Sequence, residues 1–572
     1  MKNIIKNIKS ICLPAILAIG VCGCDLDEFN PSGVTGEAVW ESSPENFVTL
    51  VNAAYHQQRY LYGKVDGVFV TESGTDIWFN RDKRLWAAQF SQYNNFTSNV
   101  GFNNNVWREF WQGVLHCNAG INRIDRVEWP NATERDQRLG ELRFLRAFYY
   151  WHIVETWGNV MLRTEEPSGP PSAERSTINE LYDVIIADLE FAAESLPASW
   201  GDQYSRASKK SAYGFLARAA LSRAYYDMNA EYFQLARDAA QTVIDRQGEF
   251  GVSLWDNYED LYDPNNNRNN REVLYEVSNS TNPSLNYDGN ANQMHQFFLS
   301  PYAGKPGLAL SMEYGRDGGR QLMPTLALLD MYDEEIDARY HASFQEVWIA
   351  NRDFTWTEQA VQQHRKDPSI VGTVIRAGID TALYNTKKSV PNKALLPYLV
   401  FDRDSVYQTE SNNGIRNGND FVVLKKFFDP ITRANEAAQP GFLNVFIMRL
   451  PEMYLIAAEA EHQLGNNGNA AEFLNVIRTR AAVKTPVDYT AQMQVTAADI
   501  TLDFILDERA RELSGEFLRW FDLKRTGTLG SRIASLNPDI TEFREHHVLR
   551  PIPQVELDAL VNGDEFGQNP GY

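Results

Sequence analysis

The helical character of this chain is clearest in the segment Glu141-Leu-Arg-Phe-Leu-Arg-Ala-Phe-Tyr-Tyr-Trp-His-Ile-Val-Glu-Thr-Trp-Gly158. Its apolar side chains recur in steps of three and four residues, namely Leu142, Leu145, Phe148, Tyr149, His152, Ile153 and Trp157. This spacing places them on one face of a helix, and Gly158 is suited to end that helix. His152 is interpreted as a hydrogen-bonded core histidine, because buried polar groups are nearly always paired. The segment predicts a mainly α fold.

Two later stretches, residues 207–245 and 451–482, have the composition of helix pairs. Alanines recur in both halves of each stretch, and small side chains allow two helices to approach closely. Units of this size with alanine on both helices resemble tetratricopeptide repeats. The pattern by itself predicts a helical scaffold and no particular function.

Residues 250–445 have a different composition, rich in Asn, Gly, Asp and aromatic residues. Short runs such as Glu272-Val-Leu-Tyr-Glu-Val277 and Phe421-Val-Val-Leu424 are typical of strands. A long irregular segment inside a compact protein is usually functional or disordered, and the aromatic content argues against disorder. We therefore expect a helical frame over about 44–249 and 446–572, which carries a loop-rich, partly β insertion over about 250–445.

The N-terminus has the pattern of an export signal. Three lysines precede an apolar run over residues 11–21, which is too short to span a membrane permanently. The sequence Val21-Cys22-Gly23-Cys24 that follows resembles a bacterial lipobox. It predicts that residues 1–23 are removed and that Cys24 carries the acyl chains that anchor the protein to a membrane. Residues 24–43 are polar and are expected to form a flexible tether.

Composition limits the partners and the chemistry. The chain has 572 residues and a formal net charge of −21, which becomes −24 when the three signal lysines are removed. Such a field repels nucleic acid and favours neutral or zwitterionic ligands, although a local basic pocket could override the average. Cys117 is the one cysteine left beside Cys24 in the mature chain, so an internal disulfide is excluded. A packed core cysteine is expected there, because the adjacent His116 does not face it on a helix.

Acidic residues do not form a convincing catalytic site. Glu508, Glu512 and Glu516 follow helical spacing, and arginines at 509, 511 and 519 lie within reach. Arginines lower carboxylate pKa values, whereas a glycosidase needs one acid with a raised pKa. We therefore expect an ion-pair network and no enzymatic activity. Asp263-Pro-Asn-Asn-Asn267 offers oxygen ligands for a structural Ca²⁺, but it lacks the glycine and final glutamate of an EF-hand loop, so a capped turn without metal or cofactor is expected.

Sugar binding requires flat apolar faces with amides, carboxylates or guanidinium groups at their rim. Residues 76–93 and the insertion supply that mixture outside any clear helical period. The residues predicted to bind glycan are Trp78, Asn80, Arg81, Trp86, Tyr93, Tyr287, Asn292, Tyr314 and Trp348. Trp78 with Asn80 and Arg81 is the strongest cluster. Packing in the core is the alternative for each aromatic residue, and it is preferred for Trp107 and Trp111.

Several separated blocks resemble the SusD/RagB family of Bacteroidetes outer-membrane lipoproteins. The clearest spans residues 143–162, which is similar to the family pattern Arg-Ala, an aromatic pair, then Trp-Gly-x-Val-Pro-Leu, with Met161 in place of the proline. Further blocks follow in family order over nearly the whole mature chain, at residues 177–197, 206–226, 449–460, 475–478, 508–513, 519–525, 551–553 and 568–572.

This resemblance implies a frame of about four helical repeats and a non-enzymatic, glycan-binding role at the cell surface. It also implies a partner, a TonB-dependent outer-membrane barrel of the SusC type, over which the lipoprotein sits as a hinged lid. RagB-like members serve oligopeptide uptake, so capture of peptides is the alternative function. The implied location is the outer membrane, with the lipid-anchored body facing the cell surface.

Overall fold

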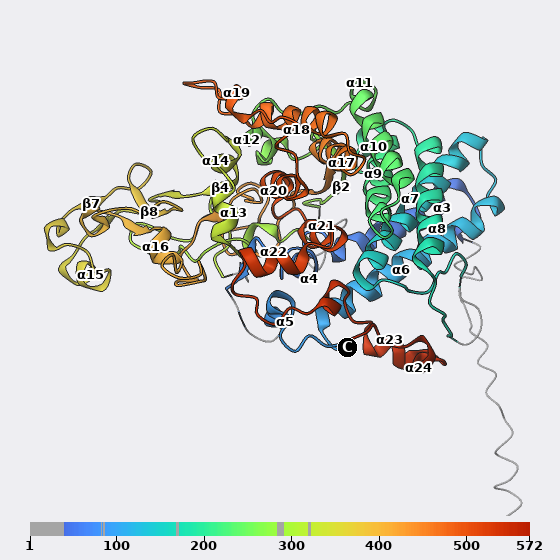
Figure 1. The fold of residues 1–572 in the computed structure, drawn as a ribbon, viewed down its shortest axis with the longest axis horizontal. Helices are drawn as coiled ribbons and strands as arrows, with labels where there is room; N and C mark the ends of the chain where they lie inside the picture. The colour runs from blue at the N-terminus through green and yellow to red at the C-terminus, as the bar shows by residue number, and fades with distance from the viewer. Residues whose placement is uncertain (1–38, 82, 84–85, 167–170, 283–290, 319–321) are drawn as a thin grey trace, which may run out of the picture.

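The computed structural model describes residues 39–572 except 82, 84–85, 167–170, 283–290 and 319–321. Helices from both ends of the chain form a frame, and a β-containing segment projects from one side of it, at the left of Figure 1. The predicted signal, Cys24, most of the predicted tether and Tyr287 lie outside the described residues. The first long helix begins at Pro44, and the Ser43 side chain caps it by accepting from the Asn46 amide.

Four helix pairs form the frame, which confirms the mainly α prediction. They are α3 (Pro44–His56) with α6 (Gly101–Arg123), α7 (Ala132–Trp157) with α8 (Ile178–Ser195), α9 (Lys209–Ala224) with α10 (Ala230–Asp245), and α17 (Leu450–Gln463) with α18 (Asn467–Ala481). Contacts of α6 with α7, α8 with α9 and α10 with α17 join the pairs into one stack. The last two pairs are the alanine-rich stretches, whose small side chains let the helices pack closely.

Helix α7 is the buried centre of this stack. The Asn131 side chain caps its start, and Gly158, with φ +76°, ends it in a conformation that glycine adopts without strain. His152 is buried, with Nε2 2.9 Å from the Tyr62 hydroxyl and Nδ1 2.8 Å from the Phe148 carbonyl oxygen. Burial lowers the pKa of His152 to about 3, so the ring is neutral. The interpretation of His152 as a paired core residue is confirmed.

Shorter helices complete the frame and the projection. In the frame they are α4 (Val65–Thr71), α5 (Trp86–Gln92), α11 (Gln247–Phe250), α19 (Thr490–Met493), α20 (Leu502–Leu513), α21 (Arg519–Arg525), α22 (Leu529–Leu536), α23 (Gln554–Ala559) and α24 (Gly563–Phe566). In the segment between the frame halves they are α12 (Tyr258–Leu261), α13 (Leu326–Asp330), α14 (Arg339–Ser343), α15 (Glu358–Gln363) and α16 (Arg403–Val406). Cys117 of α6 is fully buried, as expected of a packed core cysteine.

Strands occur in small sheets, and two of these sheets tie the projecting segment to the frame. The antiparallel pairs are β1 (Trp78–Asn80) with β3 (Leu322–Pro324), β2 (Val273–Val277) with β11 (Val445–Arg449), β4 (Phe344–Gln345) with β10 (Val423–Leu424), and β6 (Phe354–Thr355) with β7 (Val374–Ile375). In the remaining sheet β5 (Val347–Ile349) pairs antiparallel with β8 (Thr381–Asn385), which pairs parallel with β9 (Leu399–Phe401). The two runs that the sequence predicts as strands form β2 and β10, so that prediction is confirmed.

Candidate functional site

The structure corrects the prediction for the residues around β1. The Trp78 ring is only 1% exposed, and its Nε1 donates to Glu72 Oε2 at 2.8 Å. Asn80 is equally buried and donates to Ser91 Oγ at 3.1 Å. Tyr93 donates to the Gly74 carbonyl at 2.7 Å and is buried. Because β1 and its neighbours pack into the core, none of these side chains offers a face to a sugar.

A second correction concerns the aromatic residues of the insertion. Trp348 is fully buried and stacks on Tyr302, with ring centroids 5.1 Å apart, while Tyr314 packs against it at 4.8 Å. Side chains alternate between the two faces of a strand, so the neighbours Val347 and Ile349 are exposed where Trp348 is not. The strand carries an exposed face, but the tryptophan lies on the opposite one.

Two other predicted residues, Arg81 and Asn292, bond to different segments of the chain. Arg81 donates from Nε and Nη2 to Asn419 Oδ1 at 2.9 and 2.6 Å. Asn292 is half-buried and donates to the Leu443 carbonyl at 3.0 Å. Trp86 begins α5, and its side chain lies outside the described part of the structure, as does Tyr287. The contacts of Arg81 and Asn292 by themselves therefore do not define a site.

The structure instead contains a groove along the frame, which we call the Tyr204 groove. It consists of two hollows of about 510 and 270 Å³, joined by a narrow one of about 10 Å³, and all three include Tyr204 in their walls. The groove lies where the end of α3 and the 3-10 helix η1 (Gln57–Tyr60) meet the residues after η3 (Gly201–Gln203) and the end of β2. An elongated hollow of this kind is suited to a chain-like ligand.

Aromatic rings line the groove, and hydrogen bonds fix two of them. Tyr55 donates to Glu141 Oε1 at 2.7 Å and accepts from the Ala207 amide at 2.9 Å. Trp200 donates from Nε1 to the Ala207 carbonyl at 2.6 Å. Tyr55, Trp200 and Tyr204 are half-buried, so part of each ring faces the groove. Rigid, partly exposed rings are the apolar surfaces that pyranose C–H groups require.

Polar groups also line the larger hollow, and Asn279 organises them. Asn279 Oδ1 accepts from Arg59 Nη1 at 2.9 Å, and its carbonyl accepts from Arg268 Nη1 at 3.0 Å. The Asn279 amide donates to Asn444 Oδ1 at 2.9 Å, which fixes this residue against the strand preceding α17. Guanidinium and amide groups thus stand beside aromatic faces, the combination that binds sugar hydroxyls.

A further hollow, of about 500 Å³, lies on the projecting segment beside β4, β5 and β8. Half-buried Tyr384 and Tyr398 line it together with Glu346 and Lys425. Val347 and Tyr384 are cross-strand partners, so this hollow opens on the exposed face of the strand that carries Trp348. It has a similar mixture of groups, but the two larger hollows that share Tyr204 make the Tyr204 groove the better candidate for a long ligand.

Sequence reasoning missed the Tyr204 groove because its walls come from distant segments. Arg59 and Asn279 are 220 residues apart in the chain. One local signal exists in Ser199-Trp-Gly-Asp-Gln-Tyr-Ser-Arg206, where two aromatic residues stand among polar ones outside a helical period. This is the same signal that favoured residues 76–93, of which the fold buries Trp78, Asn80 and Tyr93.

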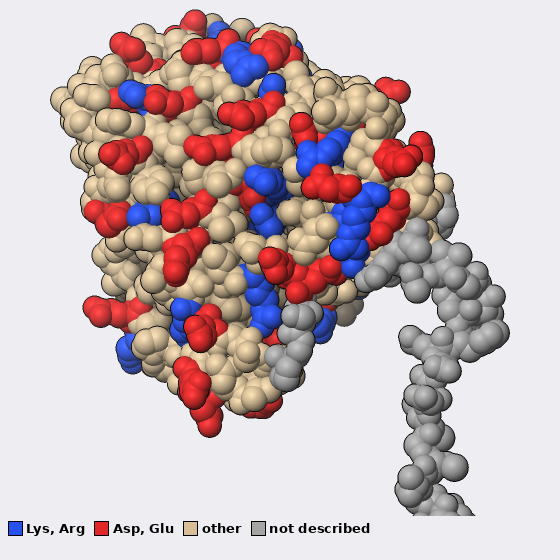
Figure 2. Space-filling model, turned by 90° about the vertical axis from the view of Figure 1, so that its right-hand side faces the viewer, with Lys and Arg blue, Asp and Glu red and all other residues tan. Residues whose placement is uncertain are grey.

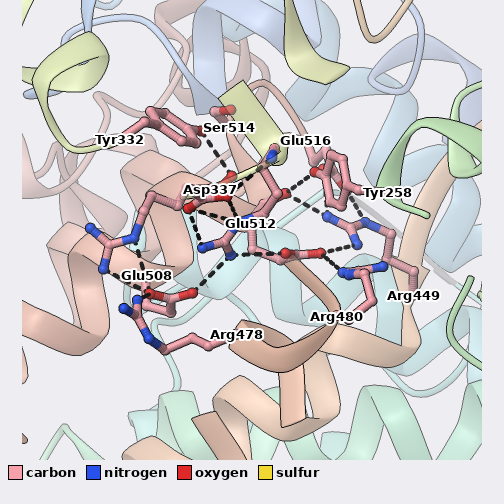
Figure 3. A network of polar contacts seen from close by, with 12 residues as sticks. Tyr258, Tyr332, Asp337, Arg449, Arg478, Arg480, Glu508, Glu512, Ser514 and Glu516 are labelled. Atoms are coloured by element: carbon pink, nitrogen blue, oxygen red, sulfur yellow. Dashed lines mark hydrogen bonds and ion pairs between the residues drawn. The ribbon is translucent and has the colours of Figure 1, made fainter. Parts of the chain in front are cut away.

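The carboxylates of α20 form a buried ion-pair network, shown in Figure 3. The shortest contacts that surround Glu512 are 2.6 Å to Arg449, 2.6 Å to Arg480 and 3.1 Å to Arg339. Burial opposes the ionisation of Glu512, but the three arginines outweigh it and lower the pKa of Glu512 below its usual value. Glu508 behaves in the same way. The prediction of an ion-pair network is confirmed.

Other charged features point to no further site in the described chain. Asp263 Oδ1 caps the 3-10 helix η4 (Pro264–Asn266) by accepting from the Asn265 amide at 2.8 Å, which confirms the capped turn. Within the described residues no three His, Cys, Asp or Glu side chains cluster as a metal site would require. Acidic and basic side chains alternate over the face of the frame seen in Figure 2, without a continuous basic patch on that face. No helix of the described ranges is long and apolar enough to span a membrane.

Comparisons with known proteins agree with the fold. A family model described as "SusD family" matches residues 271–572, more than half of the chain, and one described as "Starch-binding associating with outer membrane" matches residues 45–221. SusD-like protein P2 of Formosa agariphila is 24% identical over 97% of this chain and 98% of its own length. Starch-binding protein SusD of Bacteroides thetaiotaomicron is 23% identical over 99% of each chain. The solved structure of a laminarin-binding SusD-like protein superposes with a TM-score of 0.66 at 22% identity, covering 93% of this chain and all of that one.

Proposed function

The chain belongs to the SusD family, and on that basis we propose that it binds oligosaccharides or polysaccharides and delivers them to a TonB-dependent outer-membrane transporter of the SusC type. The observation that carries the proposal is the Tyr204 groove, in which fixed aromatic rings stand beside guanidinium and amide groups. The names of relatives support the ligand class, since one is a starch-binding protein and one structural neighbour binds laminarin.

Binding in the groove combines two physical effects. Sugar rings stack their C–H faces on Tyr55, Tyr204 and Trp200, and the loss of apolar surface to water drives this contact. Hydroxyl groups then exchange water for the amide and guanidinium groups of the larger hollow, which sets the orientation of the chain. No step of this process breaks a covalent bond, so the protein acts as a binding protein and not as an enzyme.

Delivery requires that the protein stays close to its transporter. In the proposed arrangement the acyl chains on Cys24 hold the protein in the outer membrane, facing the cell surface. Several acyl chains on one cysteine give an essentially permanent anchor, because each buried methylene contributes ~0.8 kcal/mol. The tether over residues 24–43 leaves the body free to close over the barrel and to open again. The barrel and this hinged motion are part of the proposal.

Affinity electrophoresis in gels that contain starch, laminarin or other polysaccharides tests the function. The variants Trp200→Ala and Tyr204→Ala are expected to lose retardation, while Tyr384→Ala in the other hollow is the matched control and keeps it. If Tyr384→Ala alone lost retardation, the binding site would be the hollow on the projecting segment and not the Tyr204 groove. Binding of oligopeptides with no binding of any polysaccharide would contradict the glycan proposal. New reducing ends released from a bound glycan would contradict the non-enzymatic role.

A further inference from the structure

We propose that the Tyr204 groove selects acidic saccharides, and that Arg59 and Arg268 together hold the carboxylate or sulfate group of one sugar unit. This inference rests on the proposed glycan-binding function and adds a ligand class to it. It runs against the overall charge of the chain, which is −21 and on average disfavours anionic ligands. The reasons lie in the local charge and hydrogen bonding of the groove.

Two guanidinium groups of the groove have no anionic partner in the described part of the chain. Arg59 donates to the neutral amide oxygen Asn279 Oδ1 at 2.9 Å, and Arg268 donates to the Asn279 and Phe442 carbonyls at 3.0 and 3.4 Å. Among the described residues no carboxylate oxygen lies within 4.0 Å of either group. Most other arginines of the frame are ion-paired, as Arg206 is to Glu141 at 2.7 Å in the same wall.

Arg59 is the more informative of the two cations. It is half-buried, and burial lowers the pKa of its guanidinium although the group stays charged. A cation that is partly removed from water and bonded only to neutral oxygens is incompletely compensated. A ligand anion would supply the missing charge, and charge-assisted hydrogen bonds are roughly twice as strong as neutral ones. Arg59 is therefore better suited to bind an anionic group than a hydroxyl group.

The acidic residues of the groove do not cancel these cations. Glu276 is buried, and its Oε1 accepts from Ser205 Oγ at 3.1 Å and from Asn444 Nδ2 at 2.8 Å. Its Oε2 is shielded from solvent and has no hydrogen-bond partner among the described residues. Burial raises the pKa of Glu276 to about 7, so the carboxyl is largely protonated at slightly acidic pH. In that state Glu276 carries no charge that would repel an anionic ligand.

A third cation lies at the junction of the hollows, and two exposed acids line the groove. Lys210 donates to the Val273 carbonyl at 3.1 Å and has no carboxylate within ion-pair distance in the described chain. Asp202 stands in the wall of the larger hollow, and Glu249 stands in the wall of the smaller one, where it is ion-paired to Arg246 at 2.6 Å. The groove therefore has more uncompensated positive than negative charge, in contrast to the chain as a whole.

The geometry also suits an acidic sugar better than a free anion. Arg59 and Arg268 approach the same residue, Asn279, so their guanidinium groups can engage one planar carboxylate or one sulfate from two sides. The Tyr55 and Tyr204 rings line the same hollow and supply the surface for the ring that bears the charge. The charged group thus fixes the register of the saccharide, and stacking supplies the remaining affinity.

Isothermal titration calorimetry with the mature chain separates the alternatives. The probes are three oligosaccharides of equal length: a neutral gluco-oligosaccharide, an oligogalacturonate and a sulfated galactan oligosaccharide. Carboxylate and sulfate are thereby tested in separate arms. Arg59→Gln and Arg268→Gln remove the charge but keep a side-chain amide that can still donate to Asn279. Arg352→Gln, which changes an exposed arginine of the projecting segment that donates to the Lys305 carbonyl at 3.3 Å, is the matched control.

We expect at least one acidic probe to bind about tenfold or more tightly than the neutral one, with an affinity that falls as salt is added. Each groove variant should then lose about tenfold in affinity for that acidic probe, with its affinity for the neutral probe unchanged. Arg352→Gln should bind all probes as the wild type does. Equal binding of neutral and acidic probes, unaffected by the groove variants, would overturn this inference and leave the glycan-binding proposal intact. If the protein bound none of the probes and no other saccharide, both this inference and the glycan-binding proposal would be overturned.

Discussion

Arg449 Nη1 lies 2.6 Å from Glu512 Oε1, and both side chains are shielded from solvent. Arg449 ends β11 and directly precedes α17, and Glu512 lies in the last turn of α20, so this contact joins the final helix pair of the stack to the C-terminal helices. Figure 3 shows how Arg480 and Glu516 extend the network around it. A buried network of this kind is costly to break, because removing one partner leaves an uncompensated charge in a medium of low polarity.

The first prediction follows from that relationship. Glu512→Gln leaves Arg449, Arg480 and Arg339 without their shared carboxylate, so we expect the free energy of unfolding to fall by about 3–5 kcal/mol. Urea denaturation followed by tryptophan fluorescence measures the change. Asp380→Asn, which removes the partner of the exposed Arg376, is the control and should leave the midpoint nearly unchanged. Equal effects of the two substitutions would contradict the role of burial.

The second prediction concerns the pH dependence of stability. Burial raises the pKa of Glu276 from 4.5 to about 7, with Lys210 and Arg268 as the charged groups that face it. A raised carboxyl pKa stabilises the fold below pH 4.5, and this stabilisation is lost as the pH rises through 7. The shift corresponds to at most about 3 kcal/mol. Glu276→Gln should therefore gain stability relative to the wild type between about pH 5 and pH 8.

Thermal unfolding of both proteins across this range measures the difference. Glu72, whose pKa burial also raises to about 7, is unchanged in the variant and keeps its own contribution. The difference between the two proteins therefore isolates Glu276. A difference that is constant over the whole range would show that this carboxyl does not change its charge there.

The third prediction separates core aromatics from groove aromatics. Trp78→Phe keeps the buried ring but removes the Nε1 donor to Glu72 Oε2, which should cost about 1–3 kcal/mol of stability. Its affinity for polysaccharide should equal that of the wild type. Trp200→Ala should show the opposite pattern, with weak retention in affinity gels and a nearly unchanged unfolding midpoint. Loss of glycan retention in a folded Trp78→Phe protein would show that β1 belongs to the binding site.

The fourth prediction tests the close packing of α6 on α7. A Cβ atom on Gly113 would lie 2.5 Å from the Tyr149 ring, which is itself fully buried. Gly113→Ala should thus destabilise the protein by about 1–3 kcal/mol through overpacking. Gly101→Ala at the start of the same helix is the control, since its Cβ would meet nothing within 4 Å. A stabilised Gly113→Ala protein in chemical denaturation would contradict the close approach.

The fifth prediction concerns the anchor. Cys24→Ala should abolish incorporation of labelled fatty acid and release the protein from the membrane fraction, because no acyl chain then holds it. Affinity for polysaccharide should not change, since in the proposed arrangement a tether separates Cys24 from the Tyr204 groove. Retention of the variant in membranes washed with high salt would show a second attachment. A fall in affinity would show that the anchor also takes part in binding.

The sequence by itself determined much of the frame. Apolar spacing over residues 141–158 and alanine over residues 207–245 and 451–482 specify helices that α7, α9, α10, α17 and α18 confirm. The burial of His152 and Cys117 was also predictable, because each lies on an apolar face whose only stable position is the core. These features depend on local periodicity, which a single sequence displays directly.

Tertiary structure alone decided which surfaces are free and which charges meet. Glu512 pairs with Arg339, Arg449 and Arg480, which lie on other segments, and not with the arginines of its own helix that the sequence suggested. Trp348 and Val347 are adjacent, yet the packing of β5 buries the first and exposes the second. The Tyr204 groove joins segments as distant as Arg59 and Asn279. Exposure and long-range contact depend on how the elements pack, so the local pattern that predicts a helix or a strand cannot predict the site between them.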